Sequence, residues 1–120
     1  MSAGAGYIGS HTCHHLVDAV EKVFIIDNFY SGHSWAVPEE AVLVEGDAGD
    51  VELASQLMQE HDVDTVIHFA GHIVVPESVT DPLKYYRNNT QNSRNLLEAC
   101  IYSGVNQFVF SSTAAVYGIP

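Results

Sequence analysis

The stretch Gly4-Ala5-Gly6-Tyr7-Ile8-Gly9 decides the fold that we expect for this chain of 120 residues. Gly6 and Gly9 have the spacing of the last two glycines of a dinucleotide-binding turn, where the backbone approaches a pyrophosphate at the N-terminus of a helix. The first glycine of that pattern would fall at Ala3. A glycine-rich N-terminal tail is the alternative interpretation of the same letters, so a second signal is needed.

Asp27 is that second signal. It follows the apolar run 23–26 and lies 18 residues after Gly9, close to the spacing of the carboxylate that binds the adenosine ribose hydroxyls. Its charge would repel a 2′-phosphate, and no arginine follows within the next ten residues. The pattern therefore favours NAD over NADP, the alternative being an aspartate that only caps a helix or a turn.

Four short apolar runs rich in β-branched and aromatic residues predict strands buried on both faces, as in a parallel sheet covered by helices. They are residues 23–26, 41–44, 65–70 and 108–110. Apolar side chains at helical spacing fall between them, namely Leu16, Val17 and Val20, then Leu53, Leu57 and Met58, then Leu96, Leu97, Cys100 and Ile101. Gly104 stands where a helix C-cap is expected, and residues 31–38 indicate a loop. This alternation predicts an α/β fold built from right-handed βαβ units.

Composition narrows the class of protein. Hydrophobic residues make up 47% of the chain, which predicts one globular domain over residues 1–120. Fifteen acidic residues against four basic ones argue against a nucleic acid partner and against docking on an anionic membrane. No segment approaches the ~18 apolar residues of a membrane span. Two cysteines make no disulfide framework, and with no signal peptide pattern they favour the cytoplasm.

The first strand of this fold is expected to be missing. Only three residues precede Gly4, whereas a strand needs about 4–8 residues. The doubly wound order would place that strand in the centre of the sheet, between the strands beginning at Val23 and Thr65. Because unpaired sheet edges recruit other chains, we predict a homo-oligomer or a strand supplied by another chain. The alternative is a rearranged monomer in which those two strands pair directly.

Six stretches in order along the chain resemble the UDP-glucose 4-epimerases, a family of the extended short-chain dehydrogenase/reductase superfamily. They are residues 4–12 (GAGYIGSHT), 27–33 (DNFYSGH), 45–47 (EGD), 64–71 (DTVIHFAG), 77–89 (ESVTDPLKYYRNN) and 108–118 (FVFSSTAAVYG). The resemblance covers essentially all 120 residues and corresponds to the N-terminal part of those enzymes. It implies a truncated Rossmann-like doubly wound parallel sheet that forms a single partial NAD-binding domain, and a role in galactose metabolism.

The resemblance also implies roles for particular residues. Gly6, Tyr7 and Ile8, with Gly9 behind them, would line the NAD pyrophosphate, while Asp27 and Asn28, with Ser31 and Gly32, would hold the adenosine ribose. Asp47 and Ala48 would meet the adenine, Phe69, Ala70 and Gly71 would pass along the cofactor, and Asn88 would lie near it. Thr113 would act as the catalytic hydrogen-bonding partner beside the reacting hydroxyl of the nucleotide sugar.

The family reaction inverts C4 of the hexose through hydride transfer to NAD and back, while a tyrosine assisted by a lysine four residues later removes the hydroxyl proton. None of the six tyrosines in this chain has a lysine at that position. We therefore expect this chain by itself to be inactive. Two further departures from the family are Ile73, where a cofactor-contacting lysine is usual, and Asn92, where a glycine is usual.

Several alternatives stay open. His11, Cys13, His14 and His15 could form a metal site at helical spacing, against our expectation of none. Ser111 or Ser112 could be a nucleophile, although no G-x-S-x-G motif supports it. Thr113 could be an ordinary loop hydroxyl. The parent could also be another NAD-dependent nucleotide-sugar enzyme, such as a dehydratase or decarboxylase, and the chain could be a non-catalytic binding or assembly module.

Overall fold

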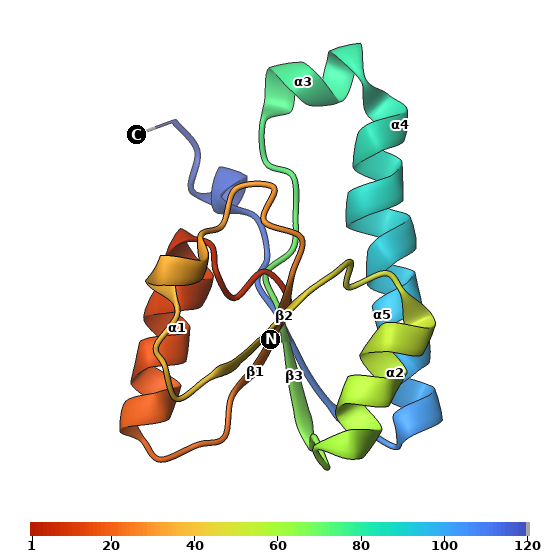
Figure 1. The fold of residues 1–120 in the computed structure, drawn as a ribbon. Coiled ribbons are helices and arrows are strands. Elements are labelled where there is room, and N and C mark those ends of the chain that lie inside the picture. The colour runs from red at the N-terminus through yellow and green to blue at the C-terminus, as the bar shows by residue number, and fades with distance from the viewer. Residues whose placement is uncertain (120) are drawn as a thin grey trace.

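The computed structural model describes residues 1–119, which form four short parallel strands with helices between them (Figure 1). The strands are β1 (Phe24–Asp27), β2 (Val42–Glu45), β3 (Thr65–His68) and β4 (Gln107–Phe110). The helices are α1 (Tyr7–Asp18), α2 (Val51–Glu60), α3 (Val75–Thr80), α4 (Pro82–Tyr85) and α5 (Asn92–Ser103), with short turns η1 (Ser34–Ala36), η2 (Tyr86–Gln91) and η3 (Ala114–Tyr117). The α/β class expected from the sequence is confirmed.

Residues Met1–Ala3 join the sheet into one piece. β1 pairs with β2 and β3 pairs with β4, while Ser2 forms a parallel bridge to Ile26 on one side and to His68 on the other. The Ser2 N–H donates to the Ile67 carbonyl at 3.0 Å, and the Ala3 N–H donates to the Ile26 carbonyl at 2.9 Å. The expectation that β1 and β3 lack their shared neighbour is wrong, because these three residues occupy the central position and leave no gap there for a strand from another chain.

The alternative of a rearranged monomer, in which the strands beginning at Val23 and Thr65 pair directly, is wrong. β1 and β3 do not pair directly, because Met1–Ala3 lie between them. The lateral order is β2, β1, Met1–Ala3, β3 and β4, which is the order of a doubly wound sheet.

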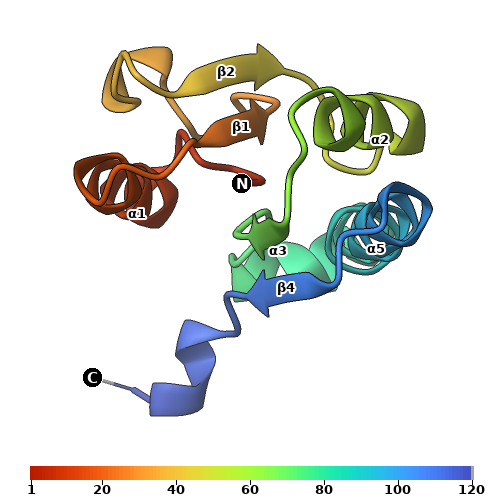
Figure 2. The same cartoon turned by 90° about the horizontal axis from the view of Figure 1, so that it is seen from below.

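The helices cover both faces of the sheet. Figure 2 shows α1 on one face and α2 with α5 on the other. Successive residues of β1 point to opposite faces, so Ile25 packs with Cys13 of α1, whereas Ile26 packs in the cluster that holds Met58 and Leu96. The prediction that this strand is buried on both faces is confirmed.

The outer strands differ from that prediction. β2 and β4 are the edges of the sheet in the described residues, and they expose Val42, Val109 and Phe110. Their apolar runs indicated strands correctly, but the length of each run carried no information about which strand lies at an edge. Two-sided burial depends on what packs beside a strand, which is a tertiary property.

The helical faces also needed correction at two places. α5 buries Leu96, Ala99 and Cys100 and exposes Leu97 and Ile101, so the buried stripe is rotated from the one expected. Spacing of three and four residues describes one face, whereas consecutive apolar pairs are compatible with two. Near α1, Val20 is exposed with φ 63°, because the helix ends at Asp18.

The C-terminal end of α5 was predicted from the sequence, whereas the turn before its N-terminal end was not. Gly104 caps the helix in the left-handed conformation, with φ 72°, as predicted. At the other end, α4, η2 and α5 follow each other without a break, and η2 is a π-helical turn. The sequence analysis gave no such turn, because the extra residue of a π-helix leaves no periodic signature.

His68 ties the central segment to α5 from inside the fold. Its side chain is 1% exposed, with Nδ1 at 2.5 Å from the Ser2 hydroxyl and Nε2 at 2.8 Å from the Ser93 hydroxyl. The Ser93 hydroxyl donates to the Asn89 carbonyl, so it accepts from Nε2–H, and Nδ1 accepts from Ser2. Burial lowers the pKa of His68, which keeps this neutral arrangement.

Candidate functional site

The glycine turn and Asp27 meet at one point of the molecule. The Ala5 N–H donates to Oδ2 of Asp27 at 3.0 Å, and the Phe29 N–H donates to Oδ1 at 2.7 Å. Asp27 ends β1 and is 5% exposed. The two loci that the sequence placed 18 residues apart are therefore in direct contact, at the carboxyl edge of the parallel strands. This is the edge at which ligands bind in open α/β sheets.

Two glycines of the turn, Gly9 and Gly6, differ in whether the fold requires a glycine at that position. A Cβ at Gly9 would collide with the backbone at Ala3 and Gly4, so glycine is required there for α1 to pack on the central segment. A Cβ at Gly6 would meet only the Ala3 carbonyl oxygen, at 3.5 Å, which is an ordinary contact. Gly6 also has φ −75°, which any residue can adopt. Neither packing nor backbone conformation within the described residues requires glycine at Gly6.

Gly6 is also the N-cap of α1. No side chain caps this end, and no acidic residue lies in its first turn. Tyr7 and Ile8 begin the helix, and their side chains are exposed. The first turn of a helix carries unpaired N–H groups and the positive end of the helix dipole, so this turn can accept an anion.

The loop after β1 closes against the same turn. A Cβ at Gly32 would lie 2.9 Å from Oδ2 of Asp27, so only glycine lets the loop approach. The His33 N–H donates to the Ala5 carbonyl at 3.0 Å. Asn28 holds the loop in a turn, because its Oδ1 accepts the Tyr30 N–H at 3.0 Å. Ser31 lies exposed in a hollow of about 360 Å³ lined by residues 29–35.

Asp47 lies on the other side of the same edge, in the loop after β2. Its Oδ1 accepts the Gly49 N–H at 2.8 Å and the Asn92 amide at 3.2 Å. Asp47 lines an open groove of about 390 Å³, whose other walls are His72, Asp81, Leu83, Lys84, Arg87, Asn88 and Asn92. Ala48 is 7% exposed and packs in the hydrophobic core, so only its backbone is available to a ligand.

The segment after β3 forms the far wall. Phe69 and Ala70 are half-buried and held by the Ser2 hydroxyl, which accepts their N–H groups at 3.1 and 3.4 Å. Gly71 has open space around it, since the nearest atom to an added Cβ is 3.9 Å away. The structure thus brings the three predicted residues to the same edge as Asp27.

Asn89 lies at the same edge, although the sequence analysis did not single it out. Its side chain pairs with both backbone groups of His72, accepting the N–H at 2.8 Å and donating to the carbonyl at 2.9 Å. The neighbouring Asn88 donates to Oδ1 of Asn89 at 2.9 Å and lines the groove. Both stand on the π-helical turn η2, a kind of turn often found at functional sites. Two adjacent asparagines do not indicate from the sequence which of their side chains bonds to the backbone of His72.

Thr113 follows β4 and so reaches the same edge of the sheet. Its Oγ1 accepts the Ala115 N–H at 3.0 Å and caps η3, which leaves the hydroxyl proton free to donate. Of the rival residues, Cys13 is fully buried while His11, His14 and His15 are exposed on the helix surface. Residues 1–119 contain no group of three or more His, Cys, Asp or Glu placed to hold a metal ion. Within the same residues, no helix is long and apolar enough to cross a membrane.

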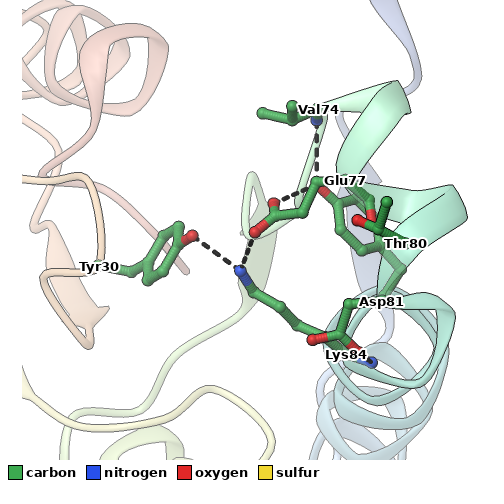
Figure 3. A network of polar contacts seen from close by, with 7 residues as sticks. Tyr30, Val74, Glu77, Thr80, Asp81 and Lys84 are labelled. Atoms are coloured by element: carbon green, nitrogen blue, oxygen red, sulfur yellow. Dashed lines mark hydrogen bonds and ion pairs between the residues drawn. The ribbon is translucent and has the colours of Figure 1, made fainter.

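A polar network that the sequence did not indicate faces this edge (Figure 3). Lys84 donates to Glu77 at 2.5 Å and to the Tyr30 hydroxyl at 2.9 Å, and the Tyr85 hydroxyl donates to Glu77 at 2.7 Å. The hydrogen bonds from Lys84 and Tyr85 lower the pKa of Glu77, and the Glu77 contact raises that of Lys84. Glu77, Lys84 and Tyr85 lie within one of the stretches quoted above, but Tyr30 precedes Lys84 by 54 residues, so spacing along the chain could not add it to them.

A glycine turn that leads into a helix, with an aspartate at the end of the next parallel strand, defines the class of Rossmann-like dinucleotide-binding folds. The chain belongs to the NAD dependent epimerase/dehydratase family, whose model matches residues 3–120. It is similar to the UDP-glucose 4-epimerase of Azospirillum brasilense, with 56% identity over 120 residues. It is also 39% identical to a UDP-glucose 4-epimerase of Klebsiella pneumoniae over 125 residues, which cover 98% of this chain and 90% of that protein.

Solved structures agree with these relatives. The chain matches the UDP-glucose 4-epimerase from Brucella ovis, crystallised in complex with NAD, with a TM-score of 0.91 and 41% identity over 99% of this chain and 36% of that one. It matches the UDP-Glc/GlcNAc 4-epimerase from Campylobacter jejuni with a TM-score of 0.88 and 42% identity over 99% of this chain and 38% of that one. The match to the Azospirillum protein covers all of this chain but only 34% of that protein's length. The resemblance to UDP-glucose 4-epimerases and the Rossmann-like α/β fold are confirmed.

Proposed function

We propose that this chain is the NAD-binding part of an epimerase that inverts C4 of a UDP-hexose and interconverts UDP-glucose and UDP-galactose. Family membership and the relatives support the reaction, and the contact between the glycine turn and Asp27 supports the cofactor. The neighbours include a UDP-Glc/GlcNAc 4-epimerase, which is why we define the substrate as a class of UDP-hexoses. The setting would be galactose metabolism in the cytoplasm.

One observation carries the assignment of NAD. Gly6 and Gly71 are glycines that the fold itself does not require, since an added Cβ would meet nothing closer than 3.5 Å and 3.9 Å respectively. Both border the carboxyl edge of the sheet, where a dinucleotide would run. Glycine at these two positions is explained if a ligand approaches the backbone there. The residues present therefore fit the cofactor.

Each predicted residue has a distinct task in this proposal. The N–H groups of Tyr7 and Ile8 at the start of α1 would bind the pyrophosphate. Asp27 would accept the ribose hydroxyls with the lone pairs that Ala5 and Phe29 leave free. Asp47 would accept the adenine amine at the rim of the groove. NAD supplies the hydride acceptor for chemistry at C4, and Thr113 would orient the reacting hydroxyl.

The chain alone is expected to lack activity. A tyrosine needs a nearby cation to lose its proton near neutral pH, and no Tyr-x-x-x-Lys pair occurs in the sequence. Purified chain incubated with UDP-galactose and NAD should give no UDP-glucose above a control without protein. A longer protein that contains this chain and the remainder of a relative serves as the positive control. Turnover by the chain alone would overturn this proposal.

We also propose that copies of the chain associate. β2 and β4 present sheet edges with exposed Val42, Val109 and Phe110, and such edges pair with other strands. Light scattering should report a mass well above the 13.1 kDa of one chain. A Lys placed at Val109 should shift the mass towards that of a monomer. A homogeneous 13.1 kDa particle for the unmodified chain would contradict the proposal.

A further inference from the structure

The network of Tyr30, Glu77, Lys84 and Tyr85 crosses the crevice at the topological switch point of the sheet. Tyr30 belongs to the loop after β1, whereas Glu77 and Lys84 belong to α3 and α4, which follow β3. Figure 3 shows the Tyr30 side chain and the Lys84 side chain reaching towards each other from these two sides. The central segment Met1–Ala3 lies between β1 and β3, so this contact spans the crevice in which a ligand of an open α/β sheet binds.

Lys84 is held firmly on its own side of the crevice. Glu77 binds it through Oε1, and the Tyr85 hydroxyl fixes the other carboxylate oxygen of Glu77. The Val74 N–H donates to the Tyr85 hydroxyl at 3.2 Å, and the Lys84 backbone is capped by Asp81. These four bonds orient the ammonium group towards the crevice before it meets Tyr30.

Tyr30 is held less firmly. Its side chain is 62% exposed. The Tyr30 hydroxyl accepts from the Lys84 ammonium, which also lies 4.9 Å from the ring centre, and the His72 ring centre lies 4.8 Å away. The loop that carries it is the one predicted to hold the adenosine ribose. A contact this exposed opens readily, because solvent competes for both groups.

We propose that Lys84 is a positioning residue that holds Tyr30 across the crevice as a strap, and that this strap slows the exchange of the dinucleotide. The inference rests on the proposed NAD site. The cofactor lies beneath the strap, between Asp27 and the segment after β3, so it enters and leaves when the Tyr30–Lys84 contact opens. Removing the contact accelerates both association and dissociation and changes the equilibrium affinity less than either rate.

The test uses the full chain and four variants. Lys84→Met removes the whole contact, whereas Tyr30→Phe removes its hydrogen bond and keeps the aromatic ring beside Lys84 and His72. Lys84→Arg preserves a donor cation and should behave as the unmodified chain. Lys22→Met removes an exposed lysine in the loop before β1 and is the matched control. The readouts are amide hydrogen exchange of residues 28–33 without cofactor and the rates of NAD binding and release by stopped flow.

Lys84→Met and Tyr30→Phe should each raise exchange in residues 28–33 and accelerate NAD release about two- to fivefold, the range of an exposed ionic contact. Unchanged exchange in both variants, or release rates equal to those of the unmodified chain, overturns the strap. An effect of Lys84→Met that is wholly absent in Tyr30→Phe also overturns it. If the unmodified chain binds no NAD, the proposed function fails, while the exchange measurement still decides whether the strap exists.

Discussion

Replacement of Gly6 with alanine is expected to weaken NAD binding by about tenfold or more while the fold persists. The added methyl group would sit in ordinary contact with the Ala3 carbonyl, 3.5 Å away, so the protein itself accommodates it. It would, however, occupy the space through which the pyrophosphate approaches the backbone, and such overpacking costs about 1–3 kcal/mol. Calorimetric titration with NAD measures the affinity, and thermal unfolding measures the stability of the same sample.

The matched control is Gly9→Ala, in the same turn. A Cβ there would lie 2.8 Å from the Gly4 Cα, and the neighbouring backbone has no room to move. We expect this variant to unfold at a clearly lower temperature, with a loss of stability of about 1–3 kcal/mol. If Gly6→Ala bound NAD as tightly as the unmodified chain, the pyrophosphate would not lie at this turn, and the cofactor assignment would be refuted.

Replacement of Asp27 with alanine should have the second large effect, on both stability and binding. The carboxylate accepts the buried Ala5 N–H and the Phe29 N–H, so the variant leaves a buried donor without a partner, at a cost of about 1–3 kcal/mol. The ribose hydroxyls lose their acceptor as well. NAD binding should fall below detection in a titration that measures the unmodified chain easily.

Two further variants separate the causes. Asp64→Ala removes an exposed carboxylate before β3 and should change neither stability nor binding. Asp27→Asn keeps one oxygen to accept a backbone N–H and should recover part of the stability but little of the NAD affinity. An Asp27→Ala chain that bound NAD normally would show that this carboxylate has only a structural task, which is the interpretation of a turn aspartate that the sequence left open.

The sequence predicted those features that depend on near neighbours along the chain. The four strands were predicted to within two residues of their bounds, because a run of β-branched and aromatic residues favours a strand locally. Gly104 was predicted as the cap of α5, because glycine adopts the left-handed backbone conformation that ends a helix. The glycine turn and Asp27 were found by a fixed spacing, and the structure places them in contact. The exposed edges β2 and β4 and the rotated face of α5 were missed, because burial depends on which neighbours pack against a segment.

Residue types and spacing alone determined that this chain is a parallel α/β unit with a glycine turn at the start of its first helix. Only the tertiary structure decided that Met1–Ala3 link the two pairs of strands, and that Gly9 serves packing whereas Gly6 faces open space. Only it brought Lys84 to Tyr30, 54 residues earlier. The physical reason is that local patterns encode how a segment folds, while contacts over such separations arise when helices and loops converge on one edge of the sheet.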